Sequence, residues 1–164
     1  MDNDAHTYHV ITGRTEFREA IRRAFAKAAD VGCREMWICD PDFADWPLGE
    51  VEVVDSLTRW ASPHRKLTML ALTYDEVLRR HPRFVDWRRR WAHVIDCRAE
   101  KDVDAGDIPS LLLAPGVIAL RLLDRVRFRA SESFENSDFV HCHEMVDAIS
   151  QRSNEAFPAT LLGL

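Results

Sequence analysis

The segment ICDPDFADWPLGE, residues 38–50, gathers three aspartates and a tryptophan directly after an apolar run. In an open parallel sheet, ligands bind beyond the carboxyl ends of the strands, where a loop that follows a buried strand emerges. Carboxylates in such a loop could bind a cation or a basic ligand. The Asp-Pro-Asp sequence equally suits a turn, since aspartate hydrogen-bonds its own backbone, and the tryptophan suits an apolar gap. The segment therefore predicts either a turn or a ligand site formed by Asp40, Asp42, Asp45 and Trp46.

A second group of charged residues lies in RRHPRFVDWRRRW, residues 79–91, which contains two tryptophans and the arginines Arg79, Arg80, Arg83, Arg88, Arg89 and Arg90. Guanidinium groups bind phosphates and carboxylates and stack on indole rings. This segment could therefore bind a phosphate-bearing ligand, an acidic protein or nucleic acid. The alternative is a solvated helix face whose arginines pair with acidic residues of the same protein or of a second subunit. The net charge of −5 favours the alternative.

Histidines are candidates for acid–base chemistry because the imidazole ring exchanges protons near neutral pH. His81 precedes Pro82 at a predicted helix break, and His93 opens a predicted strand. No sequence pattern pairs either histidine with a catalytic partner. We expect His93 to be half-buried and bonded to backbone, and both histidines remain candidates for a displaced acid–base site.

The segment FVHCHEMVD places four possible metal ligands in a row, namely His141, Cys142, His143 and Glu144. Residues two apart on a helix lie about 200° apart around its axis. The two histidines should therefore point to opposite flanks while the cysteine between them faces the core. We expect neither a metal ion nor a cofactor in this chain.

Apolar periodicity predicts the elements that must position these residues. Apolar residues at three- and four-residue spacing predict an amphipathic helix over residues 14–31, ended by Gly32. Short apolar runs predict strands over residues 34–40, 66–72, 93–99, 110–114, 117–123 and 126–130. Further helices are expected to begin at Val51, near Thr73, at Pro82 and near Ser137.

Two of these helix starts carry capping signals. Thr73 and Glu76 match a capping box, in which each side chain bonds the backbone of the other residue. Ser137 or Asp138 is expected to cap the closing helix, whose inward residues are Phe139, Cys142, Val146 and Ile149. The order of elements predicts an α/β fold in which a mixed sheet, with a parallel core and a late antiparallel hairpin, is flanked by helices.

This order of elements resembles the phospholipase D-like superfamily, whose hallmark is the motif HxKxxxxD on a strand that leads into a hairpin. The stretch VIALRLLDRVRFRASESF, residues 117–134, lies over that motif. Asp124 matches the motif aspartate, whereas Val117 stands at the histidine position and Ala119 at the lysine position. The Gly-Ser-x-Asn segment that follows in the family is replaced as well, at Ser131, Glu132 and Phe134.

The resemblance implies a mechanism that this chain cannot perform at the motif. In that mechanism one histidine attacks phosphorus, a second histidine protonates the leaving oxygen, and lysines hold the phosphate oxygens. Valine and alanine do none of this, and Asp124 suits turn chemistry or ligand binding. The segments DPDFADWPLGE and FPATLLGL are similar to bacterial proteins with the same degenerate motif.

We therefore expect a non-catalytic phospholipase D-like domain, a pseudoenzyme that acts as an interaction or ligand-binding module. By resemblance to single-repeat relatives, whose motif strands meet across two copies, we expect a homodimer. One alternative is a phosphodiesterase or nuclease with a displaced active site built from His81 or His93 and the Asp40 loop. The other is weak nucleic-acid binding through the arginine-rich segment.

Length and composition fit one globular domain. The 164 residues are 46% hydrophobic and 30% charged, and we expect residues 1–8 to form a flexible tail. No apolar stretch approaches the roughly 18 residues that would span a bilayer, and the acidic amino terminus is unlike a secretory signal. The four cysteines are widely spaced, which predicts reduced, buried thiols. We expect a cytoplasmic protein without a membrane partner.

Overall fold

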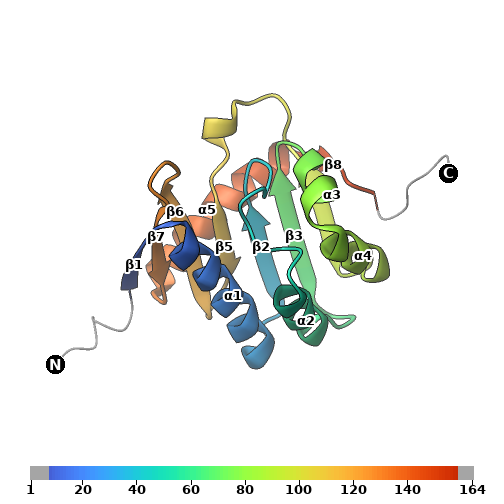
Figure 1. Cartoon of the computed structure of the whole chain (residues 1–164), viewed down its shortest axis with the longest axis horizontal. Helices are drawn as coiled ribbons and strands as arrows, with labels where there is room; N and C mark the ends of the chain where they lie inside the picture. Colours follow the sequence, from blue (N-terminus) through green and yellow to red (C-terminus); the bar gives the residue numbers. More distant parts are fainter. Residues whose placement is uncertain (1–7, 159–164) are drawn as a thin grey trace.

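The computed structural model describes residues 8–158, which are built around one mixed β-sheet (Figure 1). The strands, in the order of the chain, are β1 (Tyr8–Thr12), β2 (Glu35–Cys39), β3 (Lys66–Ala71), β4 (Ile95–Ala99), β5 (Leu111–Ala114), β6 (Ile118–Asp124), β7 (Arg129–Ser133) and β8 (Asn154–Glu155). The helices are α1 (Arg14–Val31), α2 (Val51–Trp60), α3 (Asp75–Arg80), α4 (Pro82–Arg90) and α5 (Asn136–Arg152). A short 3-10 helix spans Ala105–Asp107.

The strand order across the sheet is β1-β7-β6-β5-β2-β3-β4-β8. The strands β2, β3 and β4 run parallel, whereas β5, β6, β7 and β1 form antiparallel pairs. The predicted α/β class, with a parallel core and a late antiparallel part flanked by helices, is confirmed. The antiparallel part is larger than expected because β1 adds a strand from the other end of the chain.

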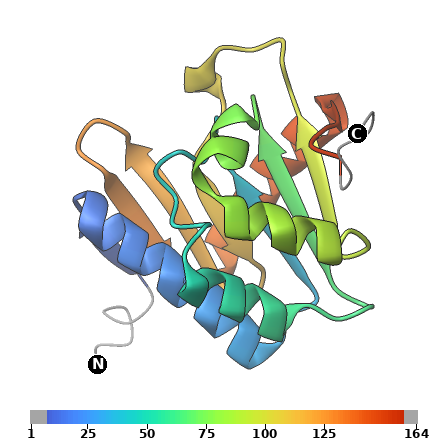
Figure 2. The same cartoon turned by 45° about the vertical axis from the view of Figure 1, so that its right-hand side comes forward.

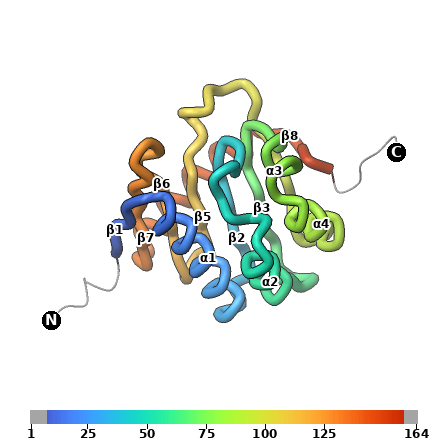
Figure 3. The backbone as a smooth tube through the Cα atoms, in the orientation of Figure 1, coloured from blue at the N-terminus to red at the C-terminus, as the bar shows by residue number. Residues whose placement is uncertain are grey.

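Helices cover both faces of this sheet. The first four helices lie on one face and α5 lies on the other, as the two views in Figures 1 and 2 show. Each face has its own apolar cluster, a large one that includes residues of α1, α2 and α4 and a smaller one that includes residues of α5. The edge strands β1 and β8 lie on opposite sides of the molecule (Figure 3).

The helix α1 forms as its apolar spacing predicts. Its buried residues are Phe17, Ala20, Ile21, Ala24, Phe25 and Ala28. Gly32 ends the helix with φ of 74°, a left-handed conformation that favours glycine, and its N–H donates to the Ala28 carbonyl at 2.8 Å. The inward residues predicted for the closing helix, Phe139, Cys142, Val146 and Ile149, are also confirmed.

The capping box is only half present, and the predicted cap of the closing helix is wrong. The Thr73 hydroxyl accepts the N–H of Asp75, the first residue of α3, at 3.3 Å, but Glu76 accepts hydrogen bonds from Arg79 and Arg80 instead of completing the box. These arginines lie three and four residues away on the same helix, so they compete for the carboxylate that a capping box needs. Helix α5 begins after Glu135, and the carboxylate of Asp138 accepts a hydrogen bond from the Ser133 hydroxyl instead.

Two predictions at strand ends are also wrong. Tyr8 belongs to β1, so the expected tail does not include it, and residues 1–7 lie outside the described part of the chain. His93 lies exposed in the turn before β4, because the strand begins only at Ile95. Of the stretch FPATLLGL, only Phe157 and Pro158 lie within the described residues. None of the helices between residues 8 and 158 has the length and apolar character needed to cross a bilayer.

Candidate ligand-binding site

Asp40 follows β2 and organises the loop after it. The residue is 7% exposed, and its Oδ2 atom accepts the backbone N–H groups of Asp42 at 3.1 Å and Phe43 at 2.7 Å. Its Oδ1 atom accepts the Trp46 Nε1–H at 3.2 Å and the Ser110 hydroxyl. Burial raises the pKa of the Asp40 carboxyl, and the hydrogen bond from Ser110 opposes this rise. Four donors therefore converge on one buried carboxyl group.

Buried aromatic rings pack together beneath the same loop, on the side of α1. Trp46 is almost fully buried and packs edge to face against Phe17, with 6.3 Å between ring centroids, and against Phe43, with 4.9 Å. Phe43 adopts φ of 58°, a conformation that is uncommon for a residue with a Cβ. The bond from its N–H to Asp40 and the burial of its ring hold it there. Trp46 thus contributes packing and one hydrogen bond to the loop.

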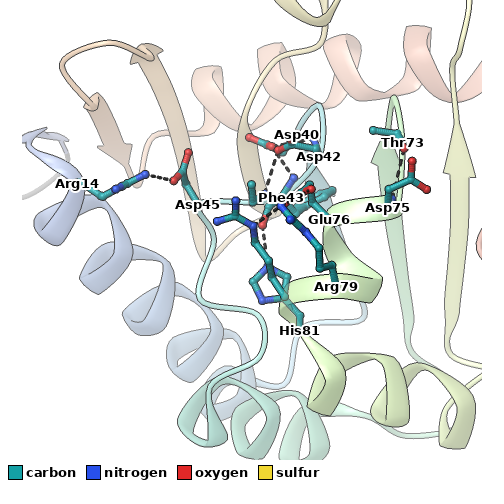
Figure 4. A network of polar contacts seen from close by, with 12 residues as sticks. Arg14, Asp40, Asp42, Phe43, Asp45, Thr73, Asp75, Glu76, Arg79 and His81 are labelled. Carbon is teal, nitrogen blue, oxygen red and sulfur yellow. Dashed lines mark hydrogen bonds and ion pairs between the residues drawn. The ribbon is translucent and has the colours of Figure 1, made fainter.

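The other carboxylates of the loop are matched within the chain. Asp42 accepts the backbone N–H of Ala44 at 2.9 Å, and Asp45 forms an ion pair with Arg14 of α1. Arg125 brings its Nη1 atom to 3.9 Å from Asp40 Oδ1. Figure 4 shows Arg14 reaching Asp45 while Asp40 faces the turn. Arg14 and Arg125 of the same chain therefore already place guanidinium groups beside Asp45 and Asp40, where a basic ligand would place its own.

His81 joins this loop to the junction of α3 and α4 (Figure 4). Its Nε2 atom lies 2.8 Å from the Phe43 carbonyl oxygen, and burial lowers the pKa of the ring. The ring is therefore neutral at pH 7, and because a carbonyl only accepts, Nε2–H is the donor. The backbone of Gly49 packs against the backbone of His81, where a Cβ on residue 49 would lie only 3.0 Å from the His81 Cα. The glycine therefore allows the loop and the helix junction to lie this close. His81 is committed to holding the loop.

The loop borders a small cavity of about 80 Å³, and the lining residues that matter here are Asp40, Asp42, Asp45, Trp46 and Arg125. This volume suits one or two water molecules, at about 30 Å³ each, and is far below the roughly 300 Å³ of an ordinary small-molecule pocket. Among residues 8–158, no three His, Cys, Asp or Glu side chains are grouped so as to hold a metal ion.

Asp124 lies at the same end of the sheet as Asp40, because β6 runs parallel to β2 through their shared antiparallel neighbour β5. Its Oδ1 atom accepts the N–H groups of Val126 at 2.9 Å and Arg127 at 3.1 Å. The bond from the Arg127 backbone lowers the pKa of the Asp124 carboxyl. The turn chemistry expected of Asp124 is therefore present.

The remaining motif positions lie in the interior of the fold. Val117 is 5% exposed and immediately precedes β6, while Ala119 is 2% exposed and belongs to the apolar cluster under α5. Ala119 of β6 is in register with Ser133 of the neighbouring strand β7. Neither position carries a group that could attack or hold a phosphate.

The arginine-rich segment is largely engaged within the chain. Arg79 and Arg80 bind Glu76, Arg83 donates to the Gly49 carbonyl at 3.3 Å, and Arg89 lies 3.7 Å from Asp86. The surface role expected of Arg88 is wrong: the residue is 7% exposed and donates to the carbonyls of Ile95 and Phe157. Arg90 is exposed and forms no polar side-chain contact with the described residues.

The histidines do not converge. His81 supports the Asp40 loop, whereas His93 lies before the amino end of β4, at the opposite end of the parallel strands. On α5, His141 and His143 are exposed while Cys142 is buried between them, as the helical geometry predicts. The rings of His143 and Trp37 pack edge to face, with 5.0 Å between centroids. Residues outside the predicted set, namely Arg14, Ser110 and Arg125, complete the Asp40 cluster, and no local pattern marks them.

No family model and no curated protein matches this sequence. Among solved structures, TrmBL2, described as an archaeal chromatin protein with a novel mode of DNA binding, is similar over 95% of this chain with a TM-score of 0.66 and 11% identity. This chain spans 56% of TrmBL2, about half its length.

Two other solved structures are similar over most of the chain. NucT from Helicobacter pylori is similar over 91% of this chain and 98% of its own, with a TM-score of 0.58 and 9% identity. Polyphosphate kinase from Porphyromonas gingivalis is similar over 92% of this chain and 27% of its own, with a TM-score of 0.59 and 14% identity. Both belong to the phospholipase D superfamily, so the shared fold is phospholipase D-like. At such low identity the likeness defines the fold alone.

Proposed function

We propose that this chain is a non-catalytic phospholipase D-like domain that acts as an interaction or ligand-binding module. The observation that carries the proposal is the burial of apolar side chains at the motif positions, Val117 and Ala119. Phosphoryl transfer needs a nucleophile and preorganised positive charge around the transferred group. A valine and an alanine packed into apolar surroundings supply neither, and His81 is held by the Phe43 carbonyl.

Hydrolysis assays test this proposal. The purified protein is incubated with bis(p-nitrophenyl) phosphate and with single-stranded DNA, with and without divalent metal ions. We expect no turnover above the buffer blank, while a phospholipase D-like nuclease serves as the positive control. Turnover that disappears in the His93→Ala or His81→Ala variant would establish the displaced active site instead.

Within this proposal, Asp42 and Asp45 are the loop carboxylates that a basic ligand could reach, since Asp40 and Trp46 are buried in the turn. The ion pair of Arg14 with Asp45 supports a guanidinium as the ligand group. Asp124 could contribute from the neighbouring hairpin tip. A titration with N-acetyl-arginine methylamide tests the idea: binding that the Asp45→Asn variant lacks supports it, and equal affinity for both proteins rejects it.

We also propose that the module forms a homodimer through the uncovered side of β1, β7 and β6. Helix α5 packs mainly on β3, β5 and β6. The same face of the sheet continues past the helix onto β7 and the edge strand β1. Three apolar side chains are exposed there, those of Tyr8, Val10 and Leu123. Exposed apolar residues gathered on one face are typical of a protein interface.

Weak nucleic-acid binding is the second candidate, and the similarity to TrmBL2 favours testing it. The free guanidinium of Arg90 and the weakly paired Arg89 are the groups in the arginine-rich segment that could contact phosphate. Such binding predicts an affinity for DNA that falls steeply with salt and falls again in an Arg89→Glu, Arg90→Glu variant. Binding that is absent or independent of salt would exclude this role.

A further inference from the structure

A second, larger pocket lies on the α5 face of the sheet, away from the Asp40 loop. Its volume is about 460 Å³, and it is bounded by the start of β2, the turn between β5 and β6 and the first half of α5. That volume is within the range of small-molecule sites. The residues that define its chemistry are Trp37, Pro115, Phe139, Glu35, His143 and Glu144.

The charge of this pocket has one sign. Glu35 and Glu144 are exposed at its rim, and no lysine or arginine is among its lining residues. Within residues 8–158, neither carboxylate takes part in a hydrogen bond or an ion pair. Two unpaired carboxylates repel an anion and attract a cation.

The walls of the pocket are aromatic and apolar. Trp37 is partly exposed, and its indole is oriented by the edge-to-face contact with His143. Phe139 and Pro115 supply further apolar surface. The face of an aromatic ring attracts a cation through its quadrupole, and tryptophan does so most strongly. The pocket therefore offers an apolar wall for a carbon chain and negative charge for the group at its end.

The same features exclude a bare metal ion as the ligand. Magnesium and calcium need six or more oxygen ligands, and the described residues contain no group of three metal-ligand side chains. An organic cation needs less, since it combines one ion pair with contact between carbon atoms and rings. An alkylammonium group on a chain of several methylenes matches the pocket in charge and in character.

We propose that this pocket binds an alkylammonium group, either of a free amine or of a lysine side chain in a partner. Pro115 and Gly116, in the turn that lines the pocket, directly precede Val117. The pocket therefore adjoins the position at which the family motif has its histidine. The proposal does not depend on the absence of catalysis, because none of its residues belongs to the motif.

Calorimetric titrations of the whole protein test the proposal with matched ligands. Cadaverine represents a free amine, and N-acetyl-lysine methylamide represents a side chain. Their neutral counterparts are 1,5-pentanediol and N-acetyl-norleucine methylamide. We expect saturable binding of at least one cation, about tenfold tighter than its neutral counterpart, as an ion pair and a cation–π contact together would give. The cation that binds more tightly identifies the source.

Variants separate this pocket from other acidic surfaces. Glu144→Gln lies on an exposed helix face and should weaken binding about fivefold, and Trp37→Leu should weaken it about tenfold. Glu19→Gln, on the exposed face of α1, is the matched control and should bind like the parent protein. Equal affinity for the cations and their neutral counterparts, or an unchanged affinity in Glu144→Gln, overturns the proposal. Circular dichroism confirms that each variant is folded.

Discussion

Asp40 illustrates how the type of a residue can suggest one role and its surroundings another. An aspartate after a parallel strand is well placed to bind a ligand, yet both of its oxygens accept hydrogen bonds from the chain itself. The turn that the Asp-Pro-Asp sequence predicts is present. The partners at Ser110 and Arg125 could not be predicted, because they lie just before β5 and just after β6, far along the chain, and only the assembled sheet brings them near.

Replacing this carboxylate should destabilise the fold. In Asp40→Asn, the amide offers one accepting oxygen, and its NH₂ group faces donors that need an acceptor. We expect the free energy of unfolding in urea to fall by about 1–3 kcal/mol, as when buried donors lose their partner. Asp55→Asn, at an exposed carboxylate of α2 that forms no hydrogen bond or ion pair within residues 8–158, should shift it by less than about 0.5 kcal/mol. Equal stability of the two variants would contradict the role given to Asp40.

His81 should make the stability depend on pH. Burial lowers the pKa of this ring from its ordinary 6.5, so near that value the unfolded chain binds a proton that the folded chain does not. Its stabilising contribution is complete above about pH 6.5, declines as the pH falls below that value and is lost once the pH passes the folded pKa.

Urea titrations at about pH 7.5 and about pH 5.5 measure this decline. The variant His81→Gln keeps a donor but cannot titrate, so it should lose less stability between the two pH values than the parent protein. His93→Gln, at an exposed histidine, should behave like the parent. A parent-like loss in His81→Gln would assign the pH dependence to other groups.

At the scale of elements, periodicity predicted most of the fold and failed at the two edge strands. The long helix α1 and the strands β2, β3, β5 and β6 follow from apolar spacing, since each buries a regular set of residues. The strand predicted over residues 126–130 overlaps β7 only at Arg129 and Ala130, because residues 125–128 form the hairpin turn. The edge strand β1 buries only Ile11, and β8 spans two residues, so neither carries a readable pattern. The capping box is incomplete and the predicted cap of the closing helix failed because neighbouring side chains compete for the same carboxylates.

Helix α4 shows two arginines, two residues apart and on opposite sides of the helix, with opposite roles. Arg88 is buried, bonds the Phe157 carbonyl at 3.2 Å and lies over the Phe157 ring, while Arg90 is exposed. Arg88→Ala should lower the free energy of unfolding by about 2 kcal/mol or more, because it removes packing and leaves buried carbonyls unpaired. Arg90→Ala should change it by less than about 0.5 kcal/mol. Chemical denaturation of the two variants side by side measures the difference.

For the whole molecule, strand direction decides which candidate site residues lie at the same end of the sheet. The parallel course of β2 and β6 brings the Asp40 loop and the Asp124 turn to one end of the sheet. The same directions leave His93 at the other end, which separates the residues of the displaced enzyme site. The order of elements predicted a parallel core and a late antiparallel hairpin, whereas the place of β5 between β2 and β6 and the contacts within each end required coordinates.

The proposed homodimer is a prediction at this scale. Val10 is 54% exposed on β1, and placing a charge there should oppose burial of that face against a second copy. Light scattering should give twice the monomer mass for the parent protein and the monomer mass for Val10→Lys. The control Val31→Lys, at the exposed end of α1, should remain dimeric. A monomeric parent protein would remove the homodimer.

The bond between Asp40 and Ser110 joins residues that are 70 positions apart in the chain. Closing so long a loop is slow and costs entropy, so contacts of this kind form after local helices and neighbouring strands. The bond from the Phe43 N–H to Asp40 joins residues only three positions apart and needs no other strand, whereas the Ser110 hydroxyl reaches the same carboxylate only when β5 docks beside β2. One carboxylate therefore belongs both to a local turn and to a contact of the assembled sheet, with Oδ2 bonded to the N–H groups of the turn and Oδ1 to the Ser110 hydroxyl.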